Sequence, residues 1–260
     1  MSFAHNNGIR YYTFDIFPRE VTHAVFTRQG GVSPEPWASL NVGGTVGDDA
    51  TRVRENRYRS FAALGRRIDS LFDVWQVHSA EAVIADAPRD PNLPLIQADA
   101  IFTDKPEVTL YMRFADCVPI MLYDLKKGVI GLAHAGWLGT VRGMTTAAVT
   151  KMRTHYGSKP ENILAAIGPS IGVDHYEVGA DVIAKVQESF GSDAERLIET
   201  RDGKTHLDLW SANFIQLQKS GVEKIEVAGL CTACHLDDWF SHRAEKGKTG
   251  RFGAMIALQR

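Results

Sequence analysis

The sequence predicts an α+β fold in which mixed β-sheets are covered by helices in a layered sandwich. Short apolar, β-branched runs alternate with longer helical patterns, but without the regular strand–helix order of a doubly wound parallel sheet. The chain has 260 residues, of which 44% are hydrophobic and 23% charged, so it can bury a large core. The polar stretch 87–94 is too short to separate domains, and we therefore expect one domain over residues 1–260.

The expected strands are short runs rich in apolar and β-branched residues, such as VTHAVFT at 21–27 and EVTLYMR at 107–113. In chain order they are 21–27, 72–77, 82–86, 99–103, 107–113, 119–124, 128–133, 163–167, 224–229 and 252–258.

The expected helices are longer, and residues typical of helix ends mark two of them. In chain order they are 49–64, 137–156, 179–190 and 207–220. Asp48 or Asp49 caps the first helix. In the last helix, Asp208 and Ser211 lie in the first turn and Gly221 follows the end.

Charge and apolar patterning exclude two classes of partner. With a formal net charge of −2, the chain is not expected to bind nucleic acid by bulk electrostatics, and its basic run 52–59 is typical of a solvated helix face. No run of about 18 apolar residues is present, so we expect no membrane span. The first residues lack the pattern of a signal peptide, which predicts a cytoplasmic protein whose three cysteines stay reduced.

Three residues capable of binding a metal each follow an apolar strand pattern. They are His78 in VWQVHS, Cys117 in ADCVPIMLYD and His134 in GLAHAGW. Strand ends feeding loops are where open sheets usually assemble sites, although these residues are too far apart in sequence for a zinc finger. Two histidines and one cysteine would leave the fourth position of tetrahedral zinc open, the pattern of a catalytic site.

The same residues also suit nucleophilic catalysis. A Cys117 thiolate activated by His78 or His134, with Asp116 or Asp99 orienting the imidazole, would serve a hydrolase or an amidase. Both hypotheses need the same thiolate, so spacing alone does not separate them.

Two further motifs match known catalytic patterns less well. GPSIG fits the nucleophile elbow G-x-S-x-G, but VDHYEVG follows it and is extended rather than helical in character. The glycine-rich HAGWLGTVRGM opens a predicted helix and is a candidate anion site, although it lacks the ending of a P-loop.

These residues belong to a set of sequence blocks that resembles one bacterial family. That family is described in turn as multicopper polyphenol oxidase (laccase), peptidoglycan editing factor and purine nucleoside phosphorylase. The blocks run in family order from about residue 22 to 256, and they are specific only together. They are FTRQGGVS, SLNVG, QVHSAEA, ADAIFT, ADCVPIMLYD, GLAHAGWLGT, IGPSIG with YEVG, HLDLWSANFIQL, CTACHLDDWFSHR and TGRFGAMI.

The resemblance implies a zinc-binding, single-domain fold related to cysteine-hydrolase-like toxin domains. Family members phosphorolyse adenosine, inosine, guanosine and methylthioadenosine to base and ribose 1-phosphate, and they deaminate adenosine. The family's catalytic metal ligands fall on His78, Cys117 and His134, the three residues already singled out. The implied cofactor is Zn²⁺, with Cu²⁺ as the alternative, and the implied partners are a purine nucleoside and phosphate. A monomer and a homodimer both remain open.

Substrate contacts are expected from side chains in the matching blocks. Arg28 in FTRQGGVS and Arg243 in FSHR are candidates for phosphate or ribose, because guanidinium groups fit such anions. Asn41, Gln76 and Asp116 are further candidates.

The chain departs from the family pattern at several positions. The family commonly reads HAGWRGT where this chain has Leu138, and we expect Arg142, four residues later on the same helix face, to supply the missing guanidinium. Asp174 and His175 stand where the family has a cysteine pair, and Ala244 replaces an arginine.

The segment CTACH at 231–235 fits the haem-attachment pattern C-x-x-C-H and offers most of a zinc site. The absence of an export signal disfavours haem, and the family's metal site does not use cysteines from this segment. We therefore expect Cys231, Cys234 and His235 to form a structural turn near the pocket. Replacing both cysteines with serine should leave one zinc bound.

Three functions compete at this point. The first is the zinc-dependent purine nucleoside phosphorylase with adenosine deaminase activity, and the second is a Cys117 hydrolase or amidase that edits peptidoglycan precursors. The third, a copper polyphenol oxidase, is disfavoured because the nine histidines include no H-x-H pair.

Overall fold

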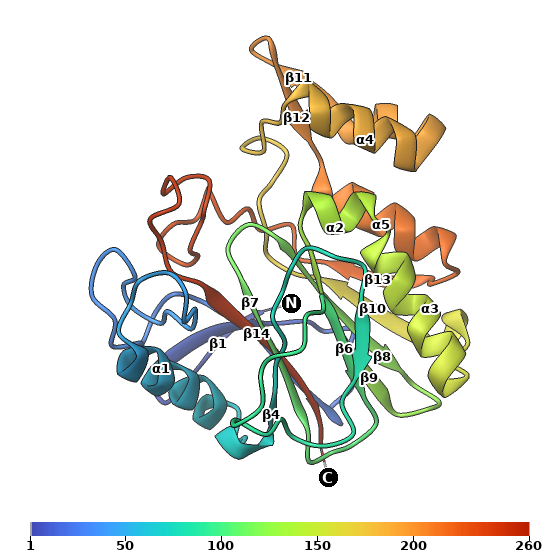
Figure 1. The fold of residues 1–260 in the computed structure, drawn as a ribbon. Helices are drawn as coiled ribbons and strands as arrows, with labels where there is room; N and C mark the ends of the chain where they lie inside the picture. The colour runs from blue at the N-terminus through green and yellow to red at the C-terminus, as the bar shows by residue number, and fades with distance from the viewer. Residues whose placement is uncertain (1, 260) are drawn as a thin grey trace.

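Two β-sheets pack face to face in the computed structural model of the chain, which describes residues 2–259 (Figure 1). Neighbouring strands of the first sheet are antiparallel, except for a parallel pairing of its last two. Its strand order is β1 (Ser2–Asn6), β2 (Ile9–Thr13), β3 (Val21–Phe26), β14 (Phe252–Leu258), β7 (Thr109–Phe114) and β4 (Leu71–Phe72).

The second sheet is also mixed, with parallel pairs at both edges and antiparallel pairs between them. Its strand order is β13 (Lys224–Val227), β10 (Ile163–Ile167), β8 (Val118–Asp124), β9 (Val129–Ala135), β6 (Ala100–Thr103) and β5 (Ala82–Ile84).

Helices cover the outer faces of both sheets, which completes the layers (Figure 1). Helix α1 (Ala50–Ala63) packs on the first sheet, and α3 (Met144–Tyr156) and α5 (Leu209–Lys219) pack on the second. Helix α2 (Trp137–Val141) precedes α3, and α4 (Ala180–Phe190) lies near the hairpin of β11 (Ile198–Arg201) and β12 (Lys204–Leu207). The predicted α+β architecture of mixed sheets covered by helices is therefore confirmed.

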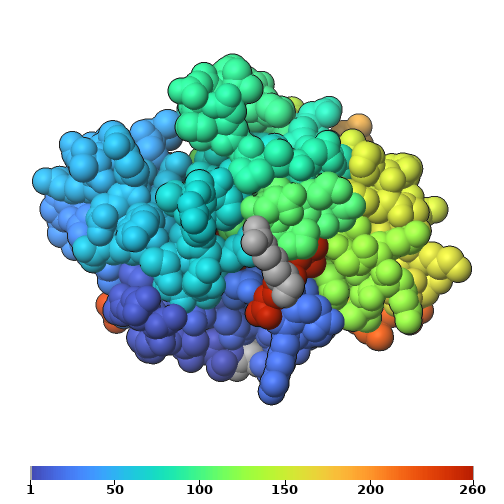
Figure 2. Space-filling view, turned by 90° about the horizontal axis from the view of Figure 1, so that it is seen from below, coloured from blue at the N-terminus to red at the C-terminus, as the bar shows by residue number. Residues whose placement is uncertain are grey.

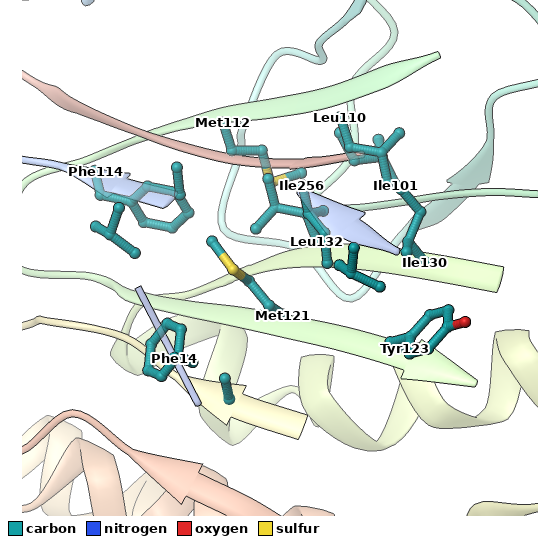
Figure 3. Close-up of a cluster of buried hydrophobic side chains, with 14 of the residues drawn as sticks. Phe14, Ile101, Leu110, Met112, Phe114, Met121, Tyr123, Ile130, Leu132 and Ile256 are labelled. Carbon is teal, nitrogen blue, oxygen red and sulfur yellow. The ribbon is translucent and has the colours of Figure 1, made fainter. Parts of the chain in front are cut away.

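The main core lies between the two sheets, and a further cluster lies beneath the helices on each outer face. Figure 3 shows Met112 and Ile256 of the first sheet facing Met121 and Leu132 of the second. Successive side chains of a strand point to opposite faces, so Tyr111 next to Met112 instead packs in the cluster beneath α1. Burial on both faces is why these strands read as nearly continuous apolar runs.

Two predicted elements are wrong in extent. The strand predicted at 72–77 is regular only at Leu71–Phe72, and the chain then runs as a loop with an isolated bridge from Trp75 to Gln97. The helix predicted at 137–156 is interrupted at Gly143, whose φ of 79° lies in the left-handed region. The first piece, α2, is consequently too short for the helix-start anion site proposed for HAGWLGTVRGM.

Two β-hairpins that were not among the predicted strands have turns with a recognisable sequence signal. Asn7 and Gly8 join β1 to β2, and Asp202 and Gly203 join β11 to β12. All four residues have positive φ values between 50° and 76°, as a type I′ turn requires. Asn-Gly and Asp-Gly are the dipeptides most typical of that turn, so the signal was present in the sequence.

The last strand, β14, lies inside the first sheet, between β3 and β7. Figure 2 shows the final residues, in red, reaching the lower surface between earlier segments of the chain. There the Gln259 N–H donates to the carbonyl of Glu20. Among the helices of residues 2–259, none is long and apolar enough to cross a membrane.

Replacing Ile256 with alanine should lower the free energy of unfolding by about 2–5 kcal/mol, because it leaves a cavity between the sheets. Ile256 is fully buried, whereas Tyr58 on α1 is 57% exposed. The control Tyr58→Ala should change stability by less than about 0.5 kcal/mol. Urea denaturation measures both, and equal losses would contradict this description of the core.

Candidate metal centre

His78, Cys117 and His134 converge at one end of the sandwich. His78 lies in the loop after β4, Cys117 in the connection 115–117 between β7 and β8, and His134 near the end of β9. Their potential ligand atoms all lie within 4.8 Å of one another. The Cys117 Sγ is 3.7 Å from the His78 Nε2, and the two imidazole rings are 4.9 Å apart between centroids.

The buried carboxylate of Asp99 orients both histidines. Its Oδ1 accepts from the His134 Nδ1 at 2.8 Å and from the backbone N–H of His78 at 3.0 Å. Its Oδ2 accepts from the backbone N–H and the hydroxyl of Ser79, at 2.6 and 2.8 Å. Because Asp99 binds Nδ1 of His134, the Nε2 of that ring is left for the metal, a common outer-shell arrangement in metal sites.

Two residues of the site have a left-handed backbone. His78 has a φ of 57° and Asp116 a φ of 81°. Such conformations cost non-glycine residues about 1–3 kcal/mol each and persist only where the surroundings enforce them. Asp99 holds the His78 backbone, while the Asp116 carboxylate accepts from the Thr232 hydroxyl at 2.7 Å and the Arg243 N–H at 2.7 Å.

A glycine permits the close approach of the ligands. A Cβ on Gly136 would lie 2.7 Å from the Cys117 Sγ and 3.0 Å from the His78 Cδ2. The first distance is shorter than real Cβ contacts and the second is unusually tight, so a larger residue at 136 would displace the Cys117 sulfur and crowd the imidazole. Gly136, between β9 and α2, therefore leaves room for the close approach of these two side chains.

Electrostatics favour a thiolate at Cys117. Burial raises the pKa of Cys117, but the positive charge of His134 and hydrogen bonds from His134 and His78 outweigh it and lower the pKa to about 6. Burial lowers the pKa of His134, but the thiolate and Asp99 outweigh it and raise the pKa to about 9. Burial likewise raises the pKa of Asp99, and the contacts with His134 and Ser79 overcome it and lower the pKa to about 2.

The three side chains fit a zinc ion. Typical Zn–S and Zn–N bond lengths place a sulfur and a nitrogen about 3.6 Å apart in a tetrahedral site, which agrees with the 3.7 Å between Cys117 and His78. A thiolate and two imidazoles are ligands that zinc prefers, and three protein ligands leave one position open. His78, Cys117 and His134 all line one cavity, which is the space beside the open position.

That cavity has a volume of about 560 Å³, within the range of small-molecule sites. Cationic and aromatic side chains dominate its lining. They are Arg57, Arg113, His242, Arg243, Arg251, Trp75, Trp137 and Tyr176.

The arginines of the cavity differ in their partners. Arg113 and Arg57 lie 2.9 and 3.7 Å from the buried carboxylate of Asp73, which neutralises part of their charge. The Arg251 Nη1 donates only to the carbonyls of residues 249 and 250, and among residues 2–259 no carboxylate lies at ion-pair distance from it. Arg243 donates to the carbonyl of Glu177.

The structure brings three of the six predicted substrate residues to the cavity. Gln76, Asp116 and Arg243 line it, although the Gln76 amide makes two hydrogen bonds with the Arg113 backbone. The other three do not line it.

Arg28, Asn41 and Arg142 have other partners. Arg28 is paired with Glu245 at 3.1 Å, and the buried Asn41 donates to Asp48 at 2.8 Å. The Arg142 Nη1 donates to the His78 carbonyl at 2.9 Å, so it contacts the outside of the loop that carries a ligand.

The G-x-S-x-G motif does not form a nucleophile elbow. Ser170 is buried, its hydroxyl accepts from the Trp210 Nε1 at 2.6 Å, and it donates to the Gly168 carbonyl. His206 bonds the carbonyl of Val173 instead of the serine.

Sequence reasoning assigned no role to several residues of the cavity. Arg251, His242, Trp75 and Tyr176 all belong to, or adjoin, sequence blocks that match the family. Their place in or beside matching blocks indicated that these segments matter to the family. Only the packing of loops that are distant in sequence shows which of their side chains line the cavity.

Together, the fold and the site define an α+β protein with an open metal-capable centre in a cationic cavity. A sequence model of the family described as multi-copper polyphenol oxidoreductase laccase matches residues 22–259, and the chain belongs to this family.

Several relatives and solved structures are similar over nearly the full length. Purine nucleoside phosphorylase of Deinococcus radiodurans is 42% identical over 92% of this chain and 90% of its own. Purine nucleoside phosphorylase of Bacteroides thetaiotaomicron is 35% identical over 91% of this chain and 92% of its own. The crystal structure of YlmD from Geobacillus stearothermophilus has a TM-score of 0.92 and 32% identity, covering 99% of each chain.

Asp99→Asn should lower zinc affinity roughly 10–100-fold, because the carboxylate that orients both histidines becomes a neutral amide. A titration of zinc against a competing chelator measures this. Asp104→Asn is the matched control, since that exposed carboxylate lies just beyond β6 and pairs only with Lys105 among residues 2–259. Equal affinity of the Asp99 variant and the parent would refute the orienting role.

Proposed function

We propose that the chain is a zinc-dependent purine nucleoside phosphorylase with adenosine deaminase side activity. It would convert adenosine, inosine, guanosine or methylthioadenosine and phosphate to the base and ribose 1-phosphate. The observation that carries the proposal is the open three-ligand centre inside a cavity lined by arginines and aromatic rings. The names of the relatives in Deinococcus and Bacteroides support the same reaction.

Zinc suits the donor set better than copper does. The description of the family names several coppers, yet residues 2–259 contain only two groups of three or more metal-capable side chains. Multicopper oxidation needs adjacent copper sites with many histidine ligands, which neither group supplies. When bound, zinc would supply a Lewis acid at the open position beside the reacting purine or sugar.

Arg251 and Arg243 are the proposed phosphate ligands. Arg251 is partly desolvated and lacks a carboxylate partner among the described residues, which favours an anionic ligand. Arg243 is held in place by the Glu177 carbonyl and by its position over the Tyr176 ring, 5.0 Å from the centroid. A phosphate between them would lie near the metal ligands in the same cavity.

The remaining chemistry follows from charge. Loss of the purine leaves an oxocarbenium-like ribose, and the arginines would hold the phosphate dianion against that developing positive charge. Trp75, Trp137 and Tyr176 offer aromatic faces for the purine. For deamination of adenosine, the cavity would hold C6 of the base beside the metal ligands, the metal would activate water as the nucleophile, and the exocyclic amine would leave as ammonia.

We further propose that residues 1–260 act as a single domain in the cytoplasm, as a monomer or homodimer and without nucleic acid. A core cluster with members from Tyr12 to Leu258 supports one domain. Three free cysteines fit a reducing compartment.

A second candidate is a Cys117 hydrolase or amidase acting on peptidoglycan precursors. The 3.7 Å contact with His78 and the lowered pKa of Cys117 favour it. Zinc ligation and nucleophilic attack compete for the same sulfur, so the two candidates predict opposite effects of metal on activity.

The purified zinc-loaded protein should release ribose 1-phosphate from adenosine only when phosphate is present. Chromatography of the products with and without phosphate measures this, and a chelator should abolish it. Activity of the metal-free protein on an amide substrate would favour the hydrolase. Absence of turnover of every nucleoside, with metal bound, would rule out the phosphorylase.

Arg251→Ala should lower kcat/KM for phosphate roughly 10–100-fold, since one charge-assisted contact is lost. Arg196→Ala is the control, because its side chain is 75% exposed in the segment before β11 and does not line the cavity. An unchanged kcat/KM in Arg251→Ala would remove Arg251 from the proposed site.

The same assay tests the sequence-based prediction that Arg142 supplies the guanidinium missing at Leu138. An unchanged phosphate KM in Arg142→Ala would contradict that prediction.

A further inference from the structure

A second group of metal-capable side chains lies outside the cavity. Asp174 and His175 come from the loop after β10, and Cys231 and Cys234 come from the loop after β13. Strands β10 and β13 pair in parallel, so both loops start at the same end of the sheet, where the two strands finish side by side. Neither loop alone carries a complete ligand set, but the fold joins two half-sites.

The four ligand atoms lie close enough together to share one ion. They all lie within 4.8 Å of one another. The His175 Nδ1 is 3.5 Å from the Cys234 Sγ and 3.8 Å from the Cys231 Sγ. The Asp174 Oδ2 is 3.2 Å from the Cys234 Sγ and 3.0 Å from the His175 Nδ1. Tetrahedral zinc would place such pairs about 3.4–3.6 Å apart, so only small side-chain shifts are needed.

The surrounding backbone is adapted to a thiolate. The Gly172 N–H donates to the Cys231 Sγ at 3.2 Å, which stabilises negative charge on the sulfur. A Cβ on Gly172 would lie 2.6 Å from the Asp174 Oδ1 and 3.3 Å from the Cys231 Sγ, so glycine permits this approach. A disulfide between the two cysteines would leave the convergence of Asp174 and His175 on the sulfurs unexplained.

We propose that Asp174, His175, Cys231 and Cys234 bind a second zinc ion in a closed, four-ligand structural site. Two thiolates, an imidazole and a carboxylate fill all four tetrahedral positions, unlike the open centre in the cavity. Binding releases the two thiol protons to solvent. The proposal differs from the sequence-based interpretation of CTACH as a structural turn near the pocket.

The second site braces one wall of the cavity. Thr232, next to Cys231, donates to the carboxylate of Asp116, which adjoins Cys117. Tyr176, next to His175, lines the cavity and lies beneath Arg243. A zinc ion between the two loops therefore holds in place groups that face the first metal centre, without taking part in the chemistry.

Elemental analysis of the purified protein tests the proposal through the number of zinc ions per chain. The parent should contain two, and both His175→Ala and the double variant Cys231→Ser with Cys234→Ser should contain one. His175 is exposed, so its replacement keeps the fold even if the buried Cys231 does not tolerate serine. His235→Ala is the matched control and should retain two, because His235 lies in CTACH but outside the ligand group.

A parent with one zinc that persists in His175→Ala and in the double variant would overturn the proposal. So would a parent with two zinc ions that keeps both in these variants. His78→Ala should lose the other ion and retain the one at the second site. These counts do not depend on turnover, so failure here and failure of the proposed phosphorylase activity are distinguishable.

Discussion

The Asp99 carboxylate is the contact on which the first metal centre depends. It is fully buried at the start of β6, and it binds the backbone of the His78 loop and the imidazole of His134 together. A single side chain thereby sets the orientation of two ligands that are far apart in sequence. Its negative charge in a buried position is tolerated because several donors surround it, which is also why its pKa falls to about 2 despite burial.

The third ligand is placed by the crossing between the sheets. Cys117 lies where the chain leaves β7 in the first sheet and enters β8 in the second. The left-handed Asp116 makes this crossing possible within three residues, and its carboxylate ties the crossing to Thr232 and Arg243. The candidate metal centre therefore lies where the chain passes from the first sheet to the second. The Asp116 carboxylate also connects it to the loop that carries Cys231 and Cys234, through Thr232.

Much of this arrangement was predictable from local sequence. Apolar runs pointed to all three ligand candidates, and Cys117 and His134 do lie beside or at strand ends, whereas His78 lies in the loop after the short β4. The α+β class followed from the order of the runs, and the dipeptides at Asn7–Gly8 and Asp202–Gly203 indicate two further hairpins. The position of Arg251 in the cavity and the contact of His175 with Cys234 were not predictable. Both depend on which loops the fold brings together at one end of the sheets. Arg28 illustrates the converse, since an arginine in a matching block is paired with Glu245 instead.

The place of β14 in the first sheet affects how the protein can be made. This strand lies between β3 and β7, so Ala254 pairs with Val25 across more than two hundred residues of chain. On the ribosome, the first sheet must wait for this inner strand until every other strand of both sheets has been synthesised. During that time β3 and β7 expose unpaired edges and the core face that β14 will cover. Arg251, directly before that strand, reaches the cavity at the same step, so the core between the sheets and the lining of the cavity are completed together.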